Sequence, residues 1–419
     1  MTLKFKINVL FFCLYLGSVG KYFLNLFFDF KLIDTLTIII IDVLIILLTL
    51  SFIKWKSRFM KYIFFFIIFS SIAFIISVDK SLLAHINGIR ETLVFICYFV
   101  IMDVLYQTNQ IEKINGKFIN FSYIFLTIQI PITIQQFIKF GAGDAVGGTF
   151  GYGGSGVLTF SIFLIIYYLI ENKIRTSKER LKKSIPFLIF LIPIALNETK
   201  ISFILLLLYF LSFINFKKIG SSIFITALGI LCMIAFSFIY STQENVSYKN
   251  PLEGIYSGDF LNSYLLGDEI VDEDVPRFTK LIVGTQKLAN DGDLLLGKDY
   301  GAFTGSQSRM SSEFSKKYEW LLAGSRPYSF FLIISGGVIL LVLIIWLVFS
   351  EIFRKQPKGI KNYSSPLLLF LSAVFLISLF YNDGLRSTVF SFLFVFILFF
   401  AKHFKSQSKF SKPNKLQIY

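Results

Sequence analysis

Residues 328–350 read YSFFLIISGGVILLVLIIWLVFS, an apolar run without a charged side chain. A helix of this length, at about 1.5 Å per residue, covers the roughly 30 Å hydrocarbon core of a bilayer. The run follows residues 241–327, where no segment is apolar enough to cross a bilayer. Apolar runs fill most of the remaining chain. The sequence therefore predicts a multi-span membrane protein that keeps one large loop in water.

The overall composition indicates the same class. Hydrophobic residues make up 55% of the 419 residues, and charged residues make up 16%, against about 25% in soluble proteins. The apolar runs are long and continuous, whereas strands of a membrane barrel alternate over short segments. Because a spanning helix satisfies its own backbone hydrogen bonds, we expect an all-α polytopic membrane protein.

The number of spans depends on two short apolar runs. Most runs approach the roughly 20 residues that a spanning helix needs. The seventh and eighth are shorter and leave two alternatives, two separate spans or one bent span. In order, the runs cover residues 7–24, 33–53, 60–77, 88–106, 118–138, 156–171, 184–197, 200–215, 220–240, 328–350, 364–381 and 386–402.

Lys and Arg placement favours twelve spans with both termini in the cytoplasm, because these residues collect on the cytoplasmic side. That arrangement puts 25 of the 41 Lys and Arg residues inside. Merging the two short runs would bury Asn197, Glu198 and Lys200 at membrane depth, which is costly. The net charge of +15 then mainly faces anionic lipid, so we expect a membrane-lipid partner and no nucleic-acid partner.

The chain divides into four predicted parts. Residues 241–327 form a mildly acidic extracytoplasmic loop with thirteen acidic and nine basic residues. Within it, periodicity predicts a helix over residues 277–288, with Phe278, Leu281, Ile282 and Leu288 on its apolar side, and a second helix over residues 313–322. The other parts are a bundle of nine spans (1–240), the last three spans (328–402) and a basic cytoplasmic tail (403–419).

Ionisable residues gather near the predicted outer ends of the spans. Such groups at membrane depth either line a cavity or pair with each other, and snorkelling to the headgroups is the plain alternative. Several cations on one side favour an outer cavity for an anionic lipid-linked substrate, because guanidinium groups bind phosphate well. The residues are Arg90, Glu91, Lys200, Arg326, Asp383 and Arg386.

A second candidate binding element is the loop over residues 139–156, which contains eight glycines. Successive amides at Gly148, Thr149 and Gly151 suit an anion-binding nest. A flexible turn is the alternative, and the loop alone favours it.

The sequence contains no cluster of metal ligands, so we expect neither a metal nor another cofactor. Two acidic loop residues, Asp299 and Glu319, are candidate bases because each has a basic residue near it in the loop. Asp299 directly follows Lys298, and Glu319 precedes Arg326. Each is a weak candidate, since most acidic loop residues are simply solvated.

With these features in order, the chain resembles the O-antigen polymerase and ligase family of bacterial membrane glycosyltransferases. The resemblance covers the architecture of spans and loop, together with Arg90 as an outer arginine. Gly148-Thr-Phe-Gly-Tyr-Gly-Gly154 resembles the family's Gly-Thr-Phe-Gly-Asn-Pro-Asn turn. Asn197-Glu-Thr-Lys200 resembles its Ser-Arg turn, with lysine in place of arginine. Arg277 and Leu294-Leu-Leu-Gly-Lys-Asp-Tyr-Gly-Ala-Phe303 resemble a loop arginine and its Pro-Leu-x-Gly-x-Gly-x-x-x-Phe segment.

The resemblance implies a C-type glycosyltransferase fold without a metal, in the cytoplasmic membrane, acting on an oligosaccharide linked to polyprenyl pyrophosphate. The expected function is polymerisation of repeat units on the outer face, with a flippase and a chain-length regulator as further candidate partners. Arg90, Lys200 and Arg277 would stabilise the leaving pyrophosphate. Gly148, Thr149, Gly151, Arg326 and Arg386 would bind substrate.

Two alternatives stay open. Ligases of the family carry a His-Asn pair at the end of the loop, and this chain reads Ser325-Arg-Pro-Tyr-Ser-Phe330 there, which favours a polymerase over a ligase. A flippase or other transporter is the alternative from a different class. The single large loop and the lack of a visible internal repeat weigh against it.

Overall fold

The computed structural model describes residues 2–28, 31–76, 81–108, 110–141, 143, 145–173, 185–197, 201–211, 277–298, 300–303, 313–322, 324, 326–354 and 365–403. Every regular element in these ranges is a helix. Four of the described helices are long and apolar enough to cross a membrane: Leu3–Leu26, Lys113–Phe140, Ser155–Asn172 and Tyr328–Ile352. The chain therefore has the features of a helical membrane protein.

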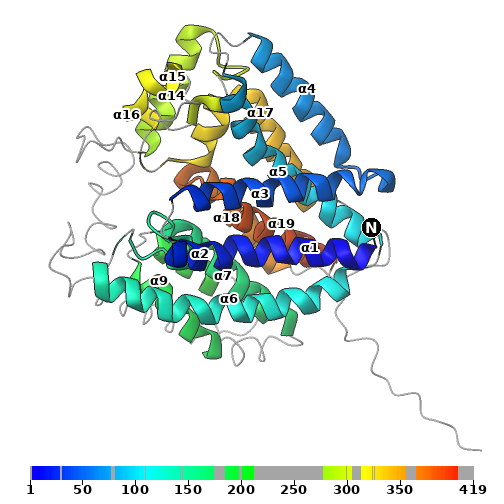
Figure 1. The fold of residues 1–419 in the computed structure, drawn as a ribbon, viewed down its shortest axis with the longest axis vertical. Helices are drawn as coiled ribbons and strands as arrows, with labels where there is room; N and C mark the ends of the chain where they lie inside the picture. Colours follow the sequence, from blue (N-terminus) through cyan, green and yellow to red (C-terminus); the bar gives the residue numbers. More distant parts are fainter. Residues whose placement is uncertain are drawn as a thin grey trace, which may run out of the picture.

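The helices follow the apolar runs along the chain (Figure 1). The runs before the large loop contain α1 (Leu3–Tyr15), α2 (Lys21–Phe28), α3 (Lys31–Leu50), α4 (Met60–Ile76), α5 (Leu82–Gln107), α6 (Ile111–Phe140), α7 (Ser155–Lys173), α9 (Ile192–Leu196) and α10 (Ile201–Leu211). The loop contains α14 (Arg277–Asp291), α15 (Glu313–Lys317) and α16 (Glu319–Leu322), and the last runs contain α17 (Tyr328–Ile352), α18 (Ser365–Tyr381) and α19 (Thr388–His403).

The core of the bundle is built on α5, α7 and α19. Residues 94–105 of α5, 158–170 of α7 and 389–401 of α19 are all buried. A helix that is apolar on every side belongs in such a position, enclosed by other helices. Around this core, α1 packs against α3 and α6, and the three lie side by side in Figure 1.

The outer helices turn large apolar side chains away from the protein. Ile68 and Ile75 of α4 and Trp346 of α17 are more than half exposed. An apolar groove of about 310 Å³ lies between these two helices, with Phe65 of α4 opposite Val342 of α17. Exposed apolar surface of this extent suits contact with lipid rather than water.

Helix α17 is interrupted where a segment of the large loop crosses it. The backbone leaves the helical conformation at Gly336 and Gly337. The crossing segment, residues 294–298 and 300–303, is called the strap below. The Lys298 amide donates to the Ile334 carbonyl over 2.8 Å, and the Val338 amide donates to the Leu294 carbonyl over 3.0 Å. The strap thus forms hydrogen bonds with backbone groups of α17 that the break in the helix would leave unpaired.

Two glycines make this crossing possible. A Cβ at Gly337, where φ is +66°, would lie 2.1 Å from the Leu295 carbonyl oxygen. A Cβ at Gly88 of α5 would lie 1.8 Å from the carbonyl oxygen of Tyr300 in the strap. Backbone therefore packs directly on backbone on both sides of the strap, and Tyr300 is almost completely buried inside the bundle.

The helices of the loop agree only in part with the sequence predictions. The helix that begins at Arg277 is confirmed and extends to Asp291, with Leu288 buried. The placement of Ile282 on its apolar side is wrong, because that side chain is 46% exposed. The single helix over 313–322 is also wrong, since Tyr318 separates two short helices there.

Other predicted elements lie outside the described residues. They are the span over 220–240, the first part of the large loop (241–276) and nearly all of the tail (404–419). Runs seven and eight contain separate helices, α9 and α10, with Asn197 described between them.

A group of charged residues, here called the Glu351 cluster, joins the end of α17 to three other segments. It consists of Arg58, Asp103, Glu351 and Lys402. Arg58 pairs with Glu351 and lies 3.8 Å from Asp103. Lys402 donates to the backbone carbonyls of Glu351 and Ile352, so a lysine side chain completes the carboxyl end of α17.

Candidate functional site

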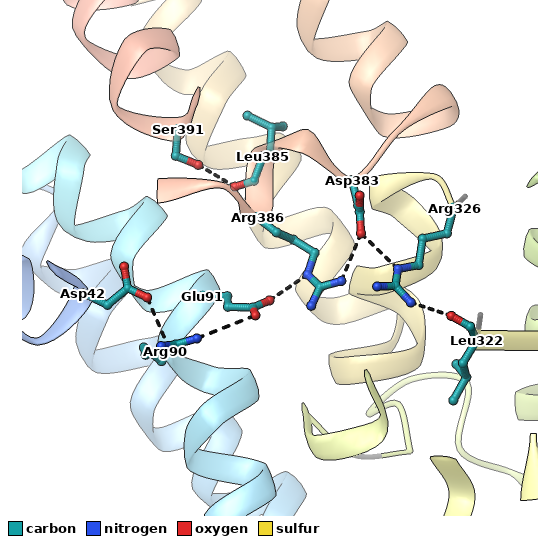
Figure 2. A network of polar contacts seen from close by, with 9 residues as sticks. All are labelled: Asp42, Arg90, Glu91, Leu322, Arg326, Asp383, Leu385, Arg386 and Ser391. Atoms are coloured by element: carbon teal, nitrogen blue, oxygen red, sulfur yellow. Dashed lines mark hydrogen bonds and ion pairs between the residues drawn. The ribbon is translucent and has the colours of Figure 1, made fainter. Parts of the chain in front are cut away.

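At the opposite ends of α5, α17 and α19, six charged residues form one chain of contacts, here called the Arg386 cluster. Figure 2 shows that the side chains come from α3, α5, the residues before α17 and the turn between α18 and α19. Cations and carboxylates alternate along the chain, and their charges balance. In order, the residues are Asp42, Arg90, Glu91, Arg386, Asp383 and Arg326.

One end of the cluster lies inside the bundle. Arg90 Nε is 3.2 Å from Asp42 Oδ2, and the Asp42 side chain is only 1% exposed. The other oxygen of Asp42 accepts a hydrogen bond of 2.6 Å from the Thr388 hydroxyl at the start of α19. Burial of a carboxylate is tolerated here because both of its oxygens have partners. This end therefore ties α3, α5 and α19 together.

The centre of the cluster joins α5 to the turn before α19. Arg386 Nε donates to Glu91 Oε2 over 2.6 Å, and the Arg90 guanidinium lies 3.9 Å from the other oxygen of Glu91. Arg90 Nη1 is buried and has no hydrogen-bond partner within the described part of the chain. An unsatisfied buried guanidinium nitrogen is costly and therefore calls for a partner.

The other end of the cluster is more open to solvent. A single oxygen of Asp383, Oδ2, accepts hydrogen bonds from Arg326 Nε at 2.9 Å and from Arg386 Nη1 at 3.0 Å. Arg326 Nη1 also donates to the Leu322 carbonyl, at the end of α16. The Asp383 side chain is 33% exposed, the largest value among the three carboxylates.

Aromatic rings fix the two arginines beside Asp383. The Arg386 guanidinium lies 4.4 Å from the ring centre of Phe331 and 5.5 Å from that of Phe303. The Arg326 guanidinium lies 4.9 Å from the same Phe303 ring. Cation–π contact orients both groups without using their N–H donors. Because Phe303 is the last residue of the strap, the strap reaches from the break in α17 to this cluster.

The electrostatics follow from burial and from these contacts. Burial opposes ionisation of Asp383, but attraction to Arg326 and Arg386 outweighs it and holds the pKa of Asp383 below its ordinary value. Burial also works against the charge of Arg386, yet Glu91 and Asp383 raise its pKa above the ordinary value. Burial and repulsion by Arg386 lower the pKa of Arg326.

Arg277 approaches the same turn from the loop helix α14. Its guanidinium lies 4.1 Å from the ring centre of Tyr381, two residues before Asp383. The neighbouring Phe278 stacks parallel on Phe380 at 6.2 Å. The start of α14 is thereby docked on the end of α18. Arg90, Arg277, Arg326 and Arg386, which the sequence places far apart, thus belong to one region.

The glycine-rich turn is held rigidly by two glutamines of α6. Gln129 accepts from the Thr149 amide and donates to its hydroxyl, at 2.9 and 2.7 Å. Gln136 accepts from the Gly148 amide and donates to its carbonyl, at 2.8 and 2.9 Å. The Gly151 amide donates to the Gly148 carbonyl. These amides already have partners, so an anion nest at Gly148, Thr149 and Gly151 is not formed in this structure, and substrate binding there stays a prediction.

The glycine-rich loop over residues 139–156 nevertheless reaches the region of the cluster at its last residue. Asn197 is buried and donates to the Ser155 carbonyl and to the Thr159 hydroxyl, at 3.2 and 2.8 Å. This holds the start of α7 in place. A Cβ at Gly156 would lie 3.1 Å from the side-chain amide of Asn382, next to Asp383.

The remaining predicted site residues are not joined to the cluster by the contacts described here. Lys200 and Asp299 lie outside the described residues. Glu319 is the exposed first residue of α16, a favourable position for an acidic side chain. Among the described residues, no group of His, Cys, Asp and Glu is arranged to hold a metal ion.

Asp42 and the Phe331 ring beside Arg386 were not among the residues predicted from the sequence. Asp42 is the one charged residue in the run Thr37–Leu48 (TIIIIDVLIILL), and such an isolated charge is itself a signal for a partner at membrane depth. Nothing in the sequence distinguishes Phe331 among 52 phenylalanines.

With this geometry established, the chain was compared with known proteins. No protein-family model, curated protein or solved structure matches it.

Proposed function

We propose that this protein is a membrane glycosyltransferase that polymerises oligosaccharide repeat units carried on polyprenyl pyrophosphate. The product is a surface polysaccharide such as an O-antigen, capsule or exopolysaccharide, made on the outer face of the cytoplasmic membrane. The substrate's diphosphate is held near the Arg386 cluster, with Arg277 beside it.

One observation carries the proposal. Segments that resemble the O-antigen polymerase and ligase family meet around the turn between α18 and α19. Arg90 of α5 lies in the cluster. Phe303, the last residue of the Leu294–Phe303 segment, lies under two arginines. Arg277 lies on Tyr381. A resemblance by chance gives no reason for these distant segments to gather at one place.

The chemistry matches the residues gathered there. An acceptor sugar hydroxyl attacks the anomeric carbon of the donor glycan and forms the new C–O bond. The bond from that carbon to the phosphate oxygen breaks, and the polyprenyl diphosphate leaves with the bonding electrons. The hydroxyl proton passes to a base. Guanidinium groups held in place before the reaction stabilise the negative charge on the leaving diphosphate.

The proposal includes the twelve-span topology. α5 is 26 residues long, which at 1.5 Å per residue exceeds the roughly 30 Å core of a bilayer. Its charges, Arg90, Glu91 and Asp103, lie near its two ends and are paired. In this topology the Arg386 cluster faces outward and the Glu351 cluster faces the cytoplasm, where Lys and Arg collect.

Analysis of lipid-linked glycans in cells that lack this protein tests the function. Polymerisation predicts single repeat units on the lipid carrier and no long chains. Long chains that accumulate on the carrier would identify a ligase instead. Repeat units trapped on the cytoplasmic face would identify a flippase.

A further inference from the structure

The Arg386 cluster is electrically balanced before any substrate binds. Its three guanidinium groups face three carboxylates, and each guanidinium lies within 4 Å of at least one of them. A diphosphate adds several negative charges to this partly buried site. Like charges repel strongly where water is scarce. A carboxylate therefore has to move away before the arginines can neutralise a diphosphate.

The three carboxylates differ in how easily they can move. Asp42 is buried in α3, where one oxygen pairs with Arg90 and the other accepts a hydrogen bond from Thr388. Glu91 belongs to α5 and lies between two arginines. Asp383 lies outside α18 and α19, in the turn that joins them, and is the most exposed of the three. Asp383 is therefore the carboxylate that can turn toward solvent at the lowest cost.

The position of Asp383 also matches that of a bound phosphate. Its Oδ2 atom accepts from two different guanidinium groups at 2.9 and 3.0 Å (Figure 2). An oxygen of a phosphate is bound by two arginines in the same manner. Phe303 supports both arginines from their faces, so the pair keeps its orientation when the anion between them is exchanged.

We propose that Asp383 is an internal stand-in for a phosphate group, which the diphosphate of the lipid-linked substrate displaces from between Arg326 and Arg386. This inference rests on the proposed function and names the two arginines that bind the diphosphate. When the site is empty, Asp383 prevents repulsion between Arg326 and Arg386. It also lowers the affinity of the site for other anions, because any ligand must displace a carboxylate that is already in place.

Binding of inorganic diphosphate to the purified full-length protein in lipid nanodiscs tests the proposal by calorimetry. Asp383→Asn removes the charge and keeps the shape of the side chain. We expect this variant to bind diphosphate at least about tenfold more tightly than the wild type, the order of effect for one charge in a partly exposed site. Arg386→Gln should bind at least about tenfold more weakly. Asp293→Asn is the matched control, because Asp293 pairs with Lys298 outside the cluster, and its affinity should be unchanged.

Two further variants separate charge from shape. Asp383→Glu retains the carboxylate and should show no gain in affinity. Asp383→Ser removes the charge in a smaller side chain and should show the same gain as Asp383→Asn. Equal or weaker binding by well-folded Asp383→Asn and Asp383→Ser would overturn the proposal. Loss of folding in both would also overturn it, since Asp383 would then be a fixed clamp.

The same experiment separates this inference from the proposed function. If the wild type and Asp383→Asn bind diphosphate alike, Arg386→Gln binds it more weakly and the wild type still makes polymer, Asp383 is not displaced and the function stands. If neither the wild type nor Asp383→Asn binds diphosphate, the Arg386 cluster is not an anion site, and the proposed function loses its binding site as well.

Discussion

The Arg386 cluster and the Glu351 cluster lie at opposite ends of α5, α17 and α19 and use the same kinds of residue. In the Glu351 cluster the carboxylates Asp103 and Glu351 are at most 2% exposed. Lys402 is also buried there and bonds backbone carbonyls. In the Arg386 cluster, Glu91 and Asp383 are 18% and 33% exposed. The carboxylates of the Glu351 cluster are closed off from solvent, although its Arg58 side chain is 32% exposed, whereas two carboxylates of the Arg386 cluster are accessible to a ligand.

The exposure of the carboxylates separates a structural ion pair from a candidate site. Buried carboxylates that pair with cations from several segments, as Asp103 and Glu351 do, fasten those segments together. A cluster whose carboxylates are partly exposed, as Glu91 and Asp383 are, can exchange one of them for another anion. We therefore expect substitutions in the Glu351 cluster to act mainly on stability and substitutions in the Arg386 cluster to act mainly on function.

The largest effect on stability is expected from Glu351→Ala. This change leaves the Arg58 guanidinium without its closest carboxylate, and breaking a buried pair costs about 3–5 kcal/mol. The cost should be at the lower value or slightly below it, because the Arg58 side chain is 32% exposed and Asp103 is still 3.8 Å from it. Thermal unfolding in detergent measures it. An unchanged unfolding midpoint would remove the distinction between the two clusters.

Gly88→Ala is expected to have an intermediate effect that reaches the Arg386 cluster without altering a charge. The added methyl group would overlap the Tyr300 carbonyl, 1.8 Å away, and such overpacking costs about 1–3 kcal/mol. The strap must shift, and Phe303 shifts with it from beneath Arg326 and Arg386. Polymer length at matched protein levels should fall.

Gly116→Ala is the control for that experiment, because a Cβ at Gly116 meets no atom within 4 Å. It should leave polymer length unchanged. A normal polymer in the Gly88→Ala variant would show that the strap does not position the arginines.

A smaller effect is expected on acidification. Because the pKa of Asp383 lies below its ordinary value in the folded protein, its ionised form stabilises the fold above the unfolded-state pKa of about 3.9. That contribution is lost as the pH falls below about 4 and through the lowered pKa. Unfolding midpoints measured between pH 7 and pH 3 should therefore fall less in Asp383→Asn than in the wild type. Parallel pH profiles would contradict this role of Asp383.

The smallest effect is expected from Lys298→Gln. Lys298 pairs with Asp293 at 2.7 Å and with Asp291 at 3.4 Å on the exposed side of the loop, where water and salt screen ion pairs. Neither the unfolding midpoint nor the polymer length should change measurably. A marked loss of polymer would extend the candidate site beyond the Arg386 cluster.

The sequence was sufficient to predict most described helices. Continuous apolar runs such as 328–350 have few ways to satisfy their backbone except as helices in a bundle. Arg90, Arg326 and Arg386 were also identifiable, because charges near the ends of such runs need a partner or a cavity. The helices and these arginines both follow from local pattern and position, so one sequence is enough to predict them.

The strap and the pairings of the cluster were not predictable in the same way. The strap satisfies the backbone of α17 across a long interval of sequence, and only the glycines at 297, 336 and 337 give a hint of the crossing. The same holds for Arg386 and Glu91, which meet across 295 residues. The prediction that Ile282 lies on the apolar side of its helix was wrong for a different reason. Helical periodicity does not say which side of α14 meets the bundle, and Ile282 is exposed.

The most direct test compares Arg386→Gln with Arg58→Gln in the same cells. Each variant removes one arginine from one cluster, and lipid-linked glycan length is measured at matched levels of folded protein. We expect Arg386→Gln to stop at single repeat units, whereas Arg58→Gln should lower the amount of folded protein and still make long chains. Long chains made by Arg386→Gln, or an equal loss of chain length in both variants, would contradict this expectation.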